Sequence, residues 1–229
     1  MVKIGIPLKY SHLEDGRCIL YLGEKVRRTI QKAGGFVVPI VQVQDVDYCD
    51  TKFDEFQELT EKEKKQIHDY LDMVDGVLFP GGHKITPFDV YLLKCCIDKN
   101  IPTLGICLGM QLMSCVDEDF KVYKNDTKTV HYQDSDFVLS HTVDIQKDSL
   151  LYKILGEEKI SVNSFHNYHA EIDNRYVVNA TSEDGYIEGI ELPDQDFHLG
   201  IQWHPEISYD FDSSSKKIID AFIKACEKK

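Results

Sequence analysis

The sequence has no apolar run that approaches the ~20 residues needed to cross a bilayer. Its first residues also lack the long apolar stretch of a signal peptide. No Pro-, Gly- or Ser-rich linker and no low-complexity run interrupts the 229 residues. We therefore expect a cytoplasmic protein without membrane contact. The length alone would allow two small domains, but the missing linker favours one domain over residues 1–229.

Basic residues are scarce. Lysine and arginine number 26 against 39 acidic residues, so the net charge is −13. Nucleic-acid binding proteins usually present a net positive face, and this balance argues against that class. A composition that is 42% hydrophobic and 28% charged is typical of a globular protein with a full core. The expected partner is a small molecule; homo-oligomers stay open.

Cysteine pairs at metal-ligand spacing are also missing. The seven cysteines form no CxxC pair and have no regular spacing. An odd count without a pattern favours reduced thiols over a disulfide framework or a zinc site. We expect six of them to be structural thiols and treat Cys107 separately because of its local sequence.

Strand-like and helix-like runs alternate through the first half. Thr60 with Glu63, and Thr86 with Asp89, are helix-start signals in which each side chain bonds a free backbone amide. Such alternation favours an α/β fold, with a parallel sheet covered by helices on both faces. The expected strands are 3–8, 36–41, 76–79 and 103–106, and the expected helices are 22–33, 60–73 and 86–100.

The second half is richer in short extended runs, and a final amphipathic helix follows. The expected strands are 140–146, 159–162, 176–181, 186–191 and 198–202, and the helix is 214–225. The acidic and aromatic segment 45–54 has no period and is interpreted as a surface loop. Ligands of parallel sheets bind beyond the carboxyl ends of the strands, which is where residues 80–82 and 105–109 fall.

Cys107 occupies a Gly-x-Cys-x-Gly turn between an expected strand and a helix. This is the thiol version of a nucleophile elbow, in which the flanking glycines let neighbouring chain approach closely. A position at a helix N-terminus favours the negatively charged thiolate. An inert thiol in an ordinary turn is the alternative that the pentapeptide leaves open.

A nucleophilic thiolate needs a proton donor for its leaving group, and the donor needs an orienting partner. His204 and Glu206 supply both and follow the expected strand 198–202, so they reach the same sheet edge as Cys107. Taken alone, a histidine such as His204 is more often a core or loop histidine than a catalytic one. Its joint occurrence with the elbow favours a Cys-His-Glu triad.

Four segments together resemble one family. Residues 105–111 (GICLGMQ) and 200–206 (GIQWHPE) resemble the class I glutamine amidotransferase superfamily, a flavodoxin-like α/β fold. Residues 162–166 (VNSFH) and 184–191 (DGYIEGIE) resemble its stand-alone γ-glutamyl hydrolases, the peptidase C26 type that includes γ-glutamyl-γ-aminobutyrate hydrolase. The resemblance covers nearly the whole chain. It implies a mostly parallel central sheet with extra antiparallel strands in the second half.

The resemblance also implies roles for named residues. Cys107 would attack a γ-glutamyl amide to form a thioester, with His204 and Glu206 completing the triad. The backbone amides of Gly82 and Leu108 would hold the oxyanion, although residues 80–82 also read as a plain tight turn. The implied substrate-binding residues are Gln111, Asn163, Ser164 and His166. Gln111 could instead be a solvated residue of the helix. The other three could instead stabilise the end of a strand through side-chain hydrogen bonds.

No cofactor is implied by this chemistry, and we expect no metal. His166 and His169 lie three residues apart, but no third ligand is spaced to join them. His83, beside the turn 80–82, either lines the pocket or is an ordinary loop histidine.

Several positions depart from the hydrolase branch. Phe88-Asp89 and Leu92 stand where an Arg-Asp-x-x-Glu pattern is common. Residues 115–119 replace a Gly-Gly-containing stretch, and Asn167-Tyr168 replaces His-Gln. All lie on the substrate side, so the leaving amine is not identified.

Three other functions compete with a stand-alone hydrolase. The nearest is a glutaminase subunit that passes ammonia to a separate synthetase chain. A non-catalytic domain of the same fold would need none of Cys107, His204 and Glu206. An α/β-hydrolase with a cysteine nucleophile normally has its acid before its histidine, whereas Glu206 follows His204 here.

Overall fold

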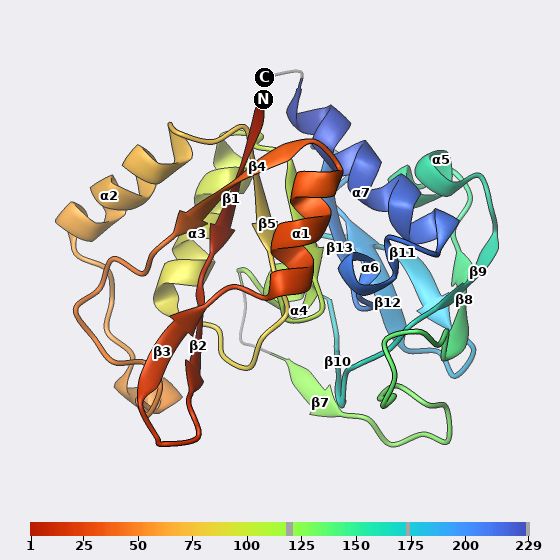
Figure 1. Cartoon of the computed structure of the whole chain (residues 1–229), viewed down its shortest axis with the longest axis horizontal. Coiled ribbons are helices and arrows are strands. Elements are labelled where there is room, and N and C mark those ends of the chain that lie inside the picture. The colour runs from red at the N-terminus through yellow and green to blue at the C-terminus, as the bar shows by residue number, and fades with distance from the viewer. Residues whose placement is uncertain (118–120, 173–174, 228–229) are drawn as a thin grey trace.

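The computed structural model describes residues 1–117, 121–172 and 175–227, so part of the segment 115–119 lies outside the described residues. The described residues form a central nine-stranded sheet (Figure 1). Five neighbouring strands are parallel, and four antiparallel strands extend the sheet. Side by side, the strands are β4 (Gly35–Ile40), β1 (Val2–Pro7), β5 (Gly76–Phe79), β6 (Thr103–Ile106), β13 (His198–Ile201), β12 (Ile187–Glu191), β11 (Val177–Ser182), β8 (His141–Ile145) and β9 (Lys159–Val162).

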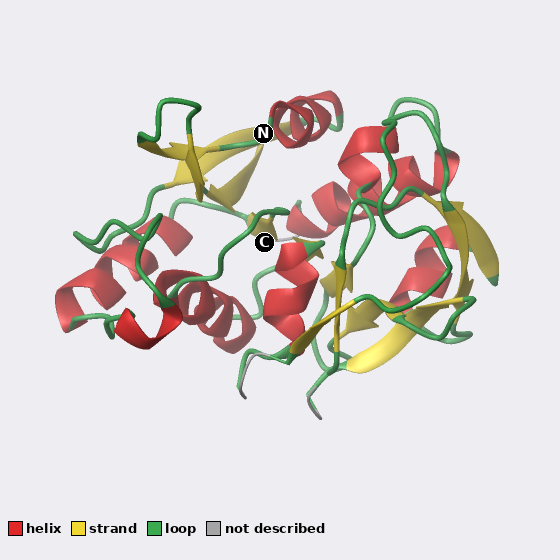
Figure 2. Ribbon diagram, turned by 90° about the horizontal axis from the view of Figure 1, so that it is seen from below, coloured by secondary structure: helices red, strands yellow, loops and turns green. Residues whose placement is uncertain are grey.

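Helices cover both faces of this sheet, as Figures 1 and 2 show. The helices are α1 (Glu24–Lys32), the 3₁₀ turn η1 (Phe53–Glu55), α2 (Glu61–Leu71), α3 (Pro87–Asp98), α4 (Leu108–Ser114), α5 (Leu150–Leu155), α6 (Pro205–Ser208) and α7 (Ser213–Cys226). One core packs α1 and α7 against the sheet, and a second core packs α2, α3 and α4 against the opposite face. The predicted α/β architecture with helices on both faces is confirmed.

Local sequence signals account for the helix starts. Thr60 accepts a hydrogen bond from the Glu63 amide while Glu63 bonds back to the Thr60 backbone, as the spacing predicts. Thr86 and Asp89 make the same reciprocal cap at α3, where Pro87 is the first helical residue. The strands 76–79, 103–106 and 159–162 match the expected boundaries, and the other expected elements differ by one or a few residues.

Two small antiparallel pairs were not predicted. The hairpin of β2 (Lys9–His12) and β3 (Cys18–Tyr21) leaves the carboxyl end of β1, and β7 (Val122–Lys124) pairs with β10 (Tyr168–Ala170). The hairpin turns at Gly16, whose φ of 82° is the left-handed conformation that glycine adopts without strain. Figure 2 shows the β2–β3 ribbon as a separate arm.

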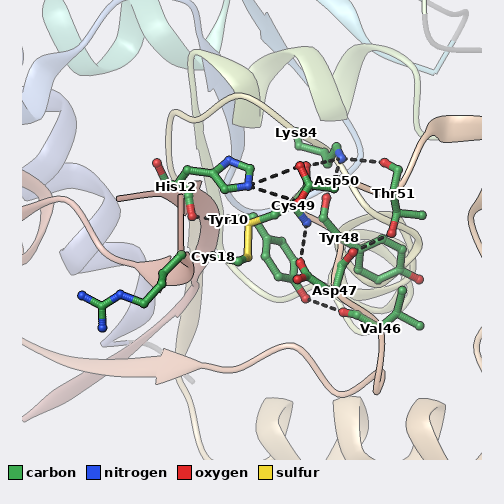
Figure 3. The surroundings of a disulfide bond; sticks show 12 residues. Tyr10, His12, Cys18, Val46, Asp47, Tyr48, Cys49, Asp50, Thr51 and Lys84 are labelled. Atoms are coloured by element: carbon green, nitrogen blue, oxygen red, sulfur yellow. Dashed lines mark hydrogen bonds and ion pairs between the residues drawn. A yellow bond between two sulfur atoms is a disulfide. The ribbon is translucent and has the colours of Figure 1, made fainter. Parts of the chain in front are cut away.

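The expectation that every cysteine is a reduced thiol is wrong for one pair. Cys18 and Cys49 form a disulfide with their Cα atoms 6.0 Å apart (Figure 3). The bond joins β3 to the segment 45–54, which is itself more than a surface loop, because Tyr48 is fully buried. Lys84 Nζ donates to backbone carbonyl oxygens of this segment. The pair escaped prediction because folding brings together residues 31 positions apart that share no motif.

Among the described helices, none combines the length and the apolar character needed to cross a bilayer.

Candidate active site

Three adjacent parallel strands deliver the predicted residues to one edge of the sheet. β5 leads to Gly81 and Gly82, β6 leads to Cys107, and β13 leads to His204. The carboxyl ends of neighbouring parallel strands meet at the same edge, which explains why these residues converge. A pocket of about 370 Å³ lies there, and its lining includes Lys9, Gly82, His83, Cys107, Phe165, His204 and Glu206.

Cys107 has the backbone of a strained elbow. Its φ of 52° and ψ of −105° are unusual for a residue with a side chain, and it caps the N-terminus of α4. The elbow is held because the Cys107 amide donates to the Ile201 carbonyl at 2.8 Å. A methyl group on Gly109 would lie 2.2 Å from the Phe79 carbonyl oxygen, so only glycine allows α4 to pack this closely on β5.

His204 is oriented by Glu206. The His204 Nδ1 atom lies 2.7 Å from Glu206 Oε1. Glu206 follows Pro205 in the first turn of the short helix α6. Burial lowers the pKa of His204, but the Glu206 carboxylate and the neighbouring Cys107 outweigh burial and raise the pKa well above its usual value. The imidazolium is therefore favoured, and its Nε2 side is available to the thiol.

The turn 80–82 packs directly against the triad. A methyl group on Gly81 would lie 2.9 Å from His204 Cε1 and 3.7 Å from Cys107 Cβ. A methyl group on Gly82 would lie 3.3 Å from Leu108 Cδ2, so Gly82 and Leu108 are neighbours. Leu108 is the first residue of α4, where a backbone amide has no partner within the helix. Gly82, which lines the pocket together with Cys107, and Leu108, which follows Cys107 in the chain, therefore lie together at this edge of the sheet.

Gln111 lies one helical turn after Cys107 and is buried rather than solvated. Its Nε2 donates to Gln202 Oε1 at 3.1 Å and to the Tyr168 carbonyl at 3.2 Å. It lines a second pocket of about 360 Å³, which shares Gly82 and His83 with the pocket at Cys107. His83 therefore lines both pockets.

Residues 163–166, the segment that follows β9, contact the residues of the site. Asn163 is buried and bonds the backbone of His204 through both polar atoms of its amide. Ser164 Oγ donates to the His131 carbonyl at 2.7 Å, and His166 lies in a buried polar cluster. Phe165, which sequence reasoning missed, is the pocket-lining residue of this segment and packs edge-on against His204.

Lys9 is a second pocket residue that sequence reasoning missed. Its Nζ lies 2.9 Å from Asp89 Oδ1, and both side chains are almost fully buried. Lys9 follows the predicted strand 3–8, so its place at the carboxyl edge of the sheet was the available signal. Asp89 thus has two roles: it caps α3 and pairs with the lysine beside the pocket.

Two groups of described residues have the composition of a metal site. The first is Cys18, Asp47 and Cys49, whose thiols are used in the disulfide. The second, His131, His141 and Glu188, is fully buried. Burial raises the pKa of Glu188, but the surrounding imidazoles outweigh burial and hold the pKa below its usual range. His169 lies outside this group and bonds Asn125, so the spacing of His166 and His169 does not create a site.

Comparison with known proteins agrees with these features. The family model for peptidase C26 matches residues 88–206. Protein NtpR of Enterococcus hirae is 30% identical over 183 residues, which cover 68% of this chain and 76% of that protein. The γ-glutamyl-γ-aminobutyrate hydrolase PuuD of Escherichia coli is 28% identical over 197 residues, 72% of this chain and 77% of the hydrolase. CTP synthase of Staphylococcus aureus is 26% identical and matches 90% of this chain, but only 41% of the synthase.

A solved structure has the same fold. The glutaminase domain of Trypanosoma brucei CTPS superimposes with a TM-score of 0.64 at 17% identity, covering 100% of this chain and 95% of that one.

Proposed function

The chain belongs to the peptidase C26 family, and from this we propose that it is a cysteine-dependent hydrolase of a small γ-glutamyl amide. Family and fold support a hydrolase of the glutamine amidotransferase type. The finer proposal is that a γ-glutamyl thioester forms on Cys107 and that glutamate and an amine are released. PuuD, whose name gives γ-glutamyl-γ-aminobutyrate as its substrate, supports this substrate class.

The observation that carries the proposal is the arrangement around His204. Its Nδ1 bonds Glu206 at 2.7 Å, and Cys107 contributes to raising its pKa. A raised imidazole pKa keeps His204 protonated, so that it can give a proton to the leaving group of a neighbouring cysteine nucleophile. A histidine that only filled space would need neither partner.

In the first step the Cys107 thiolate attacks the γ-carbonyl carbon, and a C–S bond forms. The negative charge moves to the carbonyl oxygen, to which the amides of Gly82 and Leu108 would donate. Losing one such donor typically costs ~10²–10³ in rate. The His204 imidazolium gives its proton to the amide nitrogen, the C–N bond breaks and the amine leaves.

In the second step neutral His204 takes a proton from a water molecule, whose oxygen attacks the thioester carbonyl. The C–S bond breaks, glutamate leaves and the thiolate–imidazolium pair is restored. Every bond made and broken is accounted for by the triad, the oxyanion donors and water. The mechanism therefore uses no cofactor.

Asn163, Ser164 and His166 have a different role in this proposal from the one that the resemblance implies. All three are buried, and their side chains bond protein atoms. We assign them to positioning, with Asn163 fixing the backbone of His204. Substrate contact falls instead to residues that line the two pockets, Phe165 and Gln111 among them.

We treat residues 1–229 as one hydrolase domain that acts on a small molecule in the cytoplasm. Nothing in the mechanism needs a second copy of the chain.

A glutaminase subunit is the second candidate function. The match to CTP synthase, which covers 90% of this chain but 41% of the synthase, supports it because the synthase has much further sequence. In that case ammonia would pass to a separate synthetase chain. Activity in isolation separates the two functions, since dependent glutaminases are often nearly silent until their partner docks.

The test is glutamate release by the purified chain from glutamine and from a panel of γ-glutamyl amides. We expect one γ-glutamyl amide to be preferred over glutamine, with activity abolished in Cys107→Ala and retained in the matched control Cys95→Ala. Activity that survives Cys107→Ala would overturn the mechanism. A folded wild type that is silent on the whole panel would favour the glutaminase.

A further inference from the structure

A cluster of buried imidazoles surrounds the Glu188 carboxylate, outside the pocket at Cys107. Its members come from four segments: His131 from the stretch before β8, His141 from β8, His166 from the stretch after β9, and Glu188 from β12 (Figure 1). Each side chain is at most 3% exposed. The proposed reaction uses none of the four as a reacting group.

Four separations within this cluster are close to those between neighbouring ligands of one metal ion, and His131, His141 and Glu188 each place one ligand atom within 4.8 Å of the other two. Glu188 Oε1 lies 3.3 Å from His131 Nδ1, 3.4 Å from His141 Nε2 and 3.4 Å from His166 Nε2. His131 Nδ1 and His166 Nε2 are 3.2 Å apart. Four ligands at ~2.0–2.1 Å around a tetrahedral Zn²⁺ lie ~3.3–3.4 Å from one another. The three separations from Glu188 Oε1 and the one between His131 and His166 agree with that spacing.

The outer hydrogen bonds leave electron pairs facing inward. His131 Nε2 lies 3.0 Å from Asp184 Oδ2, and His166 Nδ1 lies 3.0 Å from the Tyr168 carbonyl. A carboxylate and a carbonyl only accept, so each of these ring nitrogens carries the proton. The opposite nitrogens, His131 Nδ1 and His166 Nε2, face each other at 3.2 Å, and a metal ion would take the place of the proton that they share in its absence. A carboxylate or carbonyl that fixes a histidine in this way is the usual outer shell of a metal-bound imidazole.

The centre of the cluster lacks donors. Among the described residues, neither oxygen of Glu188 and neither ring nitrogen of His141 has a partner in good hydrogen-bond geometry, although three imidazole nitrogens lie 3.3–3.4 Å from Glu188 Oε1. Buried polar atoms without partners are costly, and here several electron-pair donors converge on one point. One proton on an imidazole would satisfy one such contact, whereas a divalent cation would satisfy all of them together.

We propose that the chain binds one divalent transition-metal ion, with Zn²⁺ as the probe, through His131 Nδ1, His141 Nε2, His166 Nε2 and Glu188 Oε1. Imidazole and carboxylate donors suit Zn²⁺ and its neighbours in the first transition row. This inference replaces the sequence-based expectation of no metal. It is independent of the proposed reaction.

The ion would have a structural role, because it would join four segments that support the active site. Asn163, which bonds the backbone of His204, lies three residues before His166. The Gln202 amide donates to the Glu188 carbonyl at 2.8 Å, two residues before His204. Metal binding would therefore stiffen the frame around His204 without touching the substrate.

Zinc loading of the purified chain tests the proposal. After chelator treatment and dialysis against ZnCl₂, we expect one bound zinc per chain in wild type, in Cys107→Ser and in the control His169→Gln. Glu188→Gln and His141→Asn are expected to lose stoichiometric zinc. Asp184→Asn, which alters only the outer shell, should weaken the affinity by ~10–100-fold.

Wild-type protein alone gives a second readout, which does not depend on how the variants fold. Co²⁺ in place of zinc should give the visible absorption of a tetrahedral site with nitrogen and oxygen ligands. A thiolate-to-cobalt band would put the ion on a cysteine and overturn the proposal. Folded wild type that binds no zinc would also overturn it, and imidazolium ion pairs would then hold the cluster.

Discussion

Asn163 holds the backbone of His204 on both sides of the residue. Its Oδ1 accepts from the His204 amide at 2.8 Å, and its Nδ2 donates to the His204 carbonyl at 2.7 Å. The same Nδ2 reaches Ser208 Oγ at 3.1 Å, in α6, the helix that contains Glu206. One buried amide therefore fixes the backbone from which the imidazole and its orienting carboxylate both project.

Replacing Asn163 by Asp tests this positioning role. The variant keeps the oxygen that accepts from the His204 amide, but puts a second oxygen against the His204 carbonyl. Because small misplacements of a catalytic group can cost ~10²-fold, we expect kcat to fall by about that factor with KM nearly unchanged. Steady-state kinetics on the preferred substrate measure kcat and KM separately. Ser161→Ala, at an exposed position of β9, is the control, and a rise in KM alone would favour direct substrate contact by Asn163.

Glu206→Gln should shift the pH dependence of the reaction. The Glu206 carboxylate raises the pKa of His204 against the lowering effect of burial, so its removal lowers that pKa. The mechanism needs protonated His204 and loses activity as pH rises through its pKa. We therefore expect the alkaline limb of kcat/KM to move to lower pH, together with a lower maximal rate. An alkaline limb that does not move would show that another group governs it.

The sequence predicted the parts of the fold that short-range rules determine. Alternating strands and helices implied the parallel sheet, and the caps at Thr60 and Thr86 located two helices. The convergence of Cys107 and His204 was predictable because strand ends and motifs coincided: the two residues follow β6 and β13, which are neighbours in the sheet. The β2–β3 hairpin carried a signal that was missed, since Asp15-Gly16 between two β-rich runs is a typical hairpin turn.

The features that the sequence did not predict depend on contacts between segments that are distant in the chain. Cys18 and Cys49 pair across 31 positions. Lys9 meets Asp89 across 80 positions, and His131 meets Glu188 from a different part of the fold. No spacing rule relates such residues, because tertiary packing alone sets their distance. For the same reason the sequence suggested that Asn163 contacts the substrate, whereas its amide bonds the backbone of His204.

Gly109→Ala should distort the elbow. The added methyl group would lie 2.2 Å from the Phe79 carbonyl oxygen, which is backbone and cannot rotate away. Overpacking of this kind typically costs ~1–3 kcal/mol, and α4 must move relative to β5 to relieve it. We expect a lower Tm and at least a tenfold loss of kcat. Gly23→Ala is the control for stability, since its methyl group would meet Val26 at an ordinary 3.7 Å. Equal Tm values for the two variants would contradict the close packing.

Reduction of the Cys18–Cys49 disulfide should destabilise the chain without removing the triad. In the chain-entropy model, closing a loop of this length stabilises the folded state by about 3–4 kcal/mol, since 31 positions separate the cysteines. We expect oxidised protein to melt at a higher temperature than the same protein in dithiothreitol. The double variant Cys18→Ser/Cys49→Ser should melt near the reduced protein and show no further response to dithiothreitol, while keeping its hydrolase activity.

Thiol alkylation followed by mass spectrometry checks the bond itself. A response to reductant in the double variant would place the sensitive thiol elsewhere, and equal melting of oxidised and reduced wild type would remove the disulfide as a source of stability.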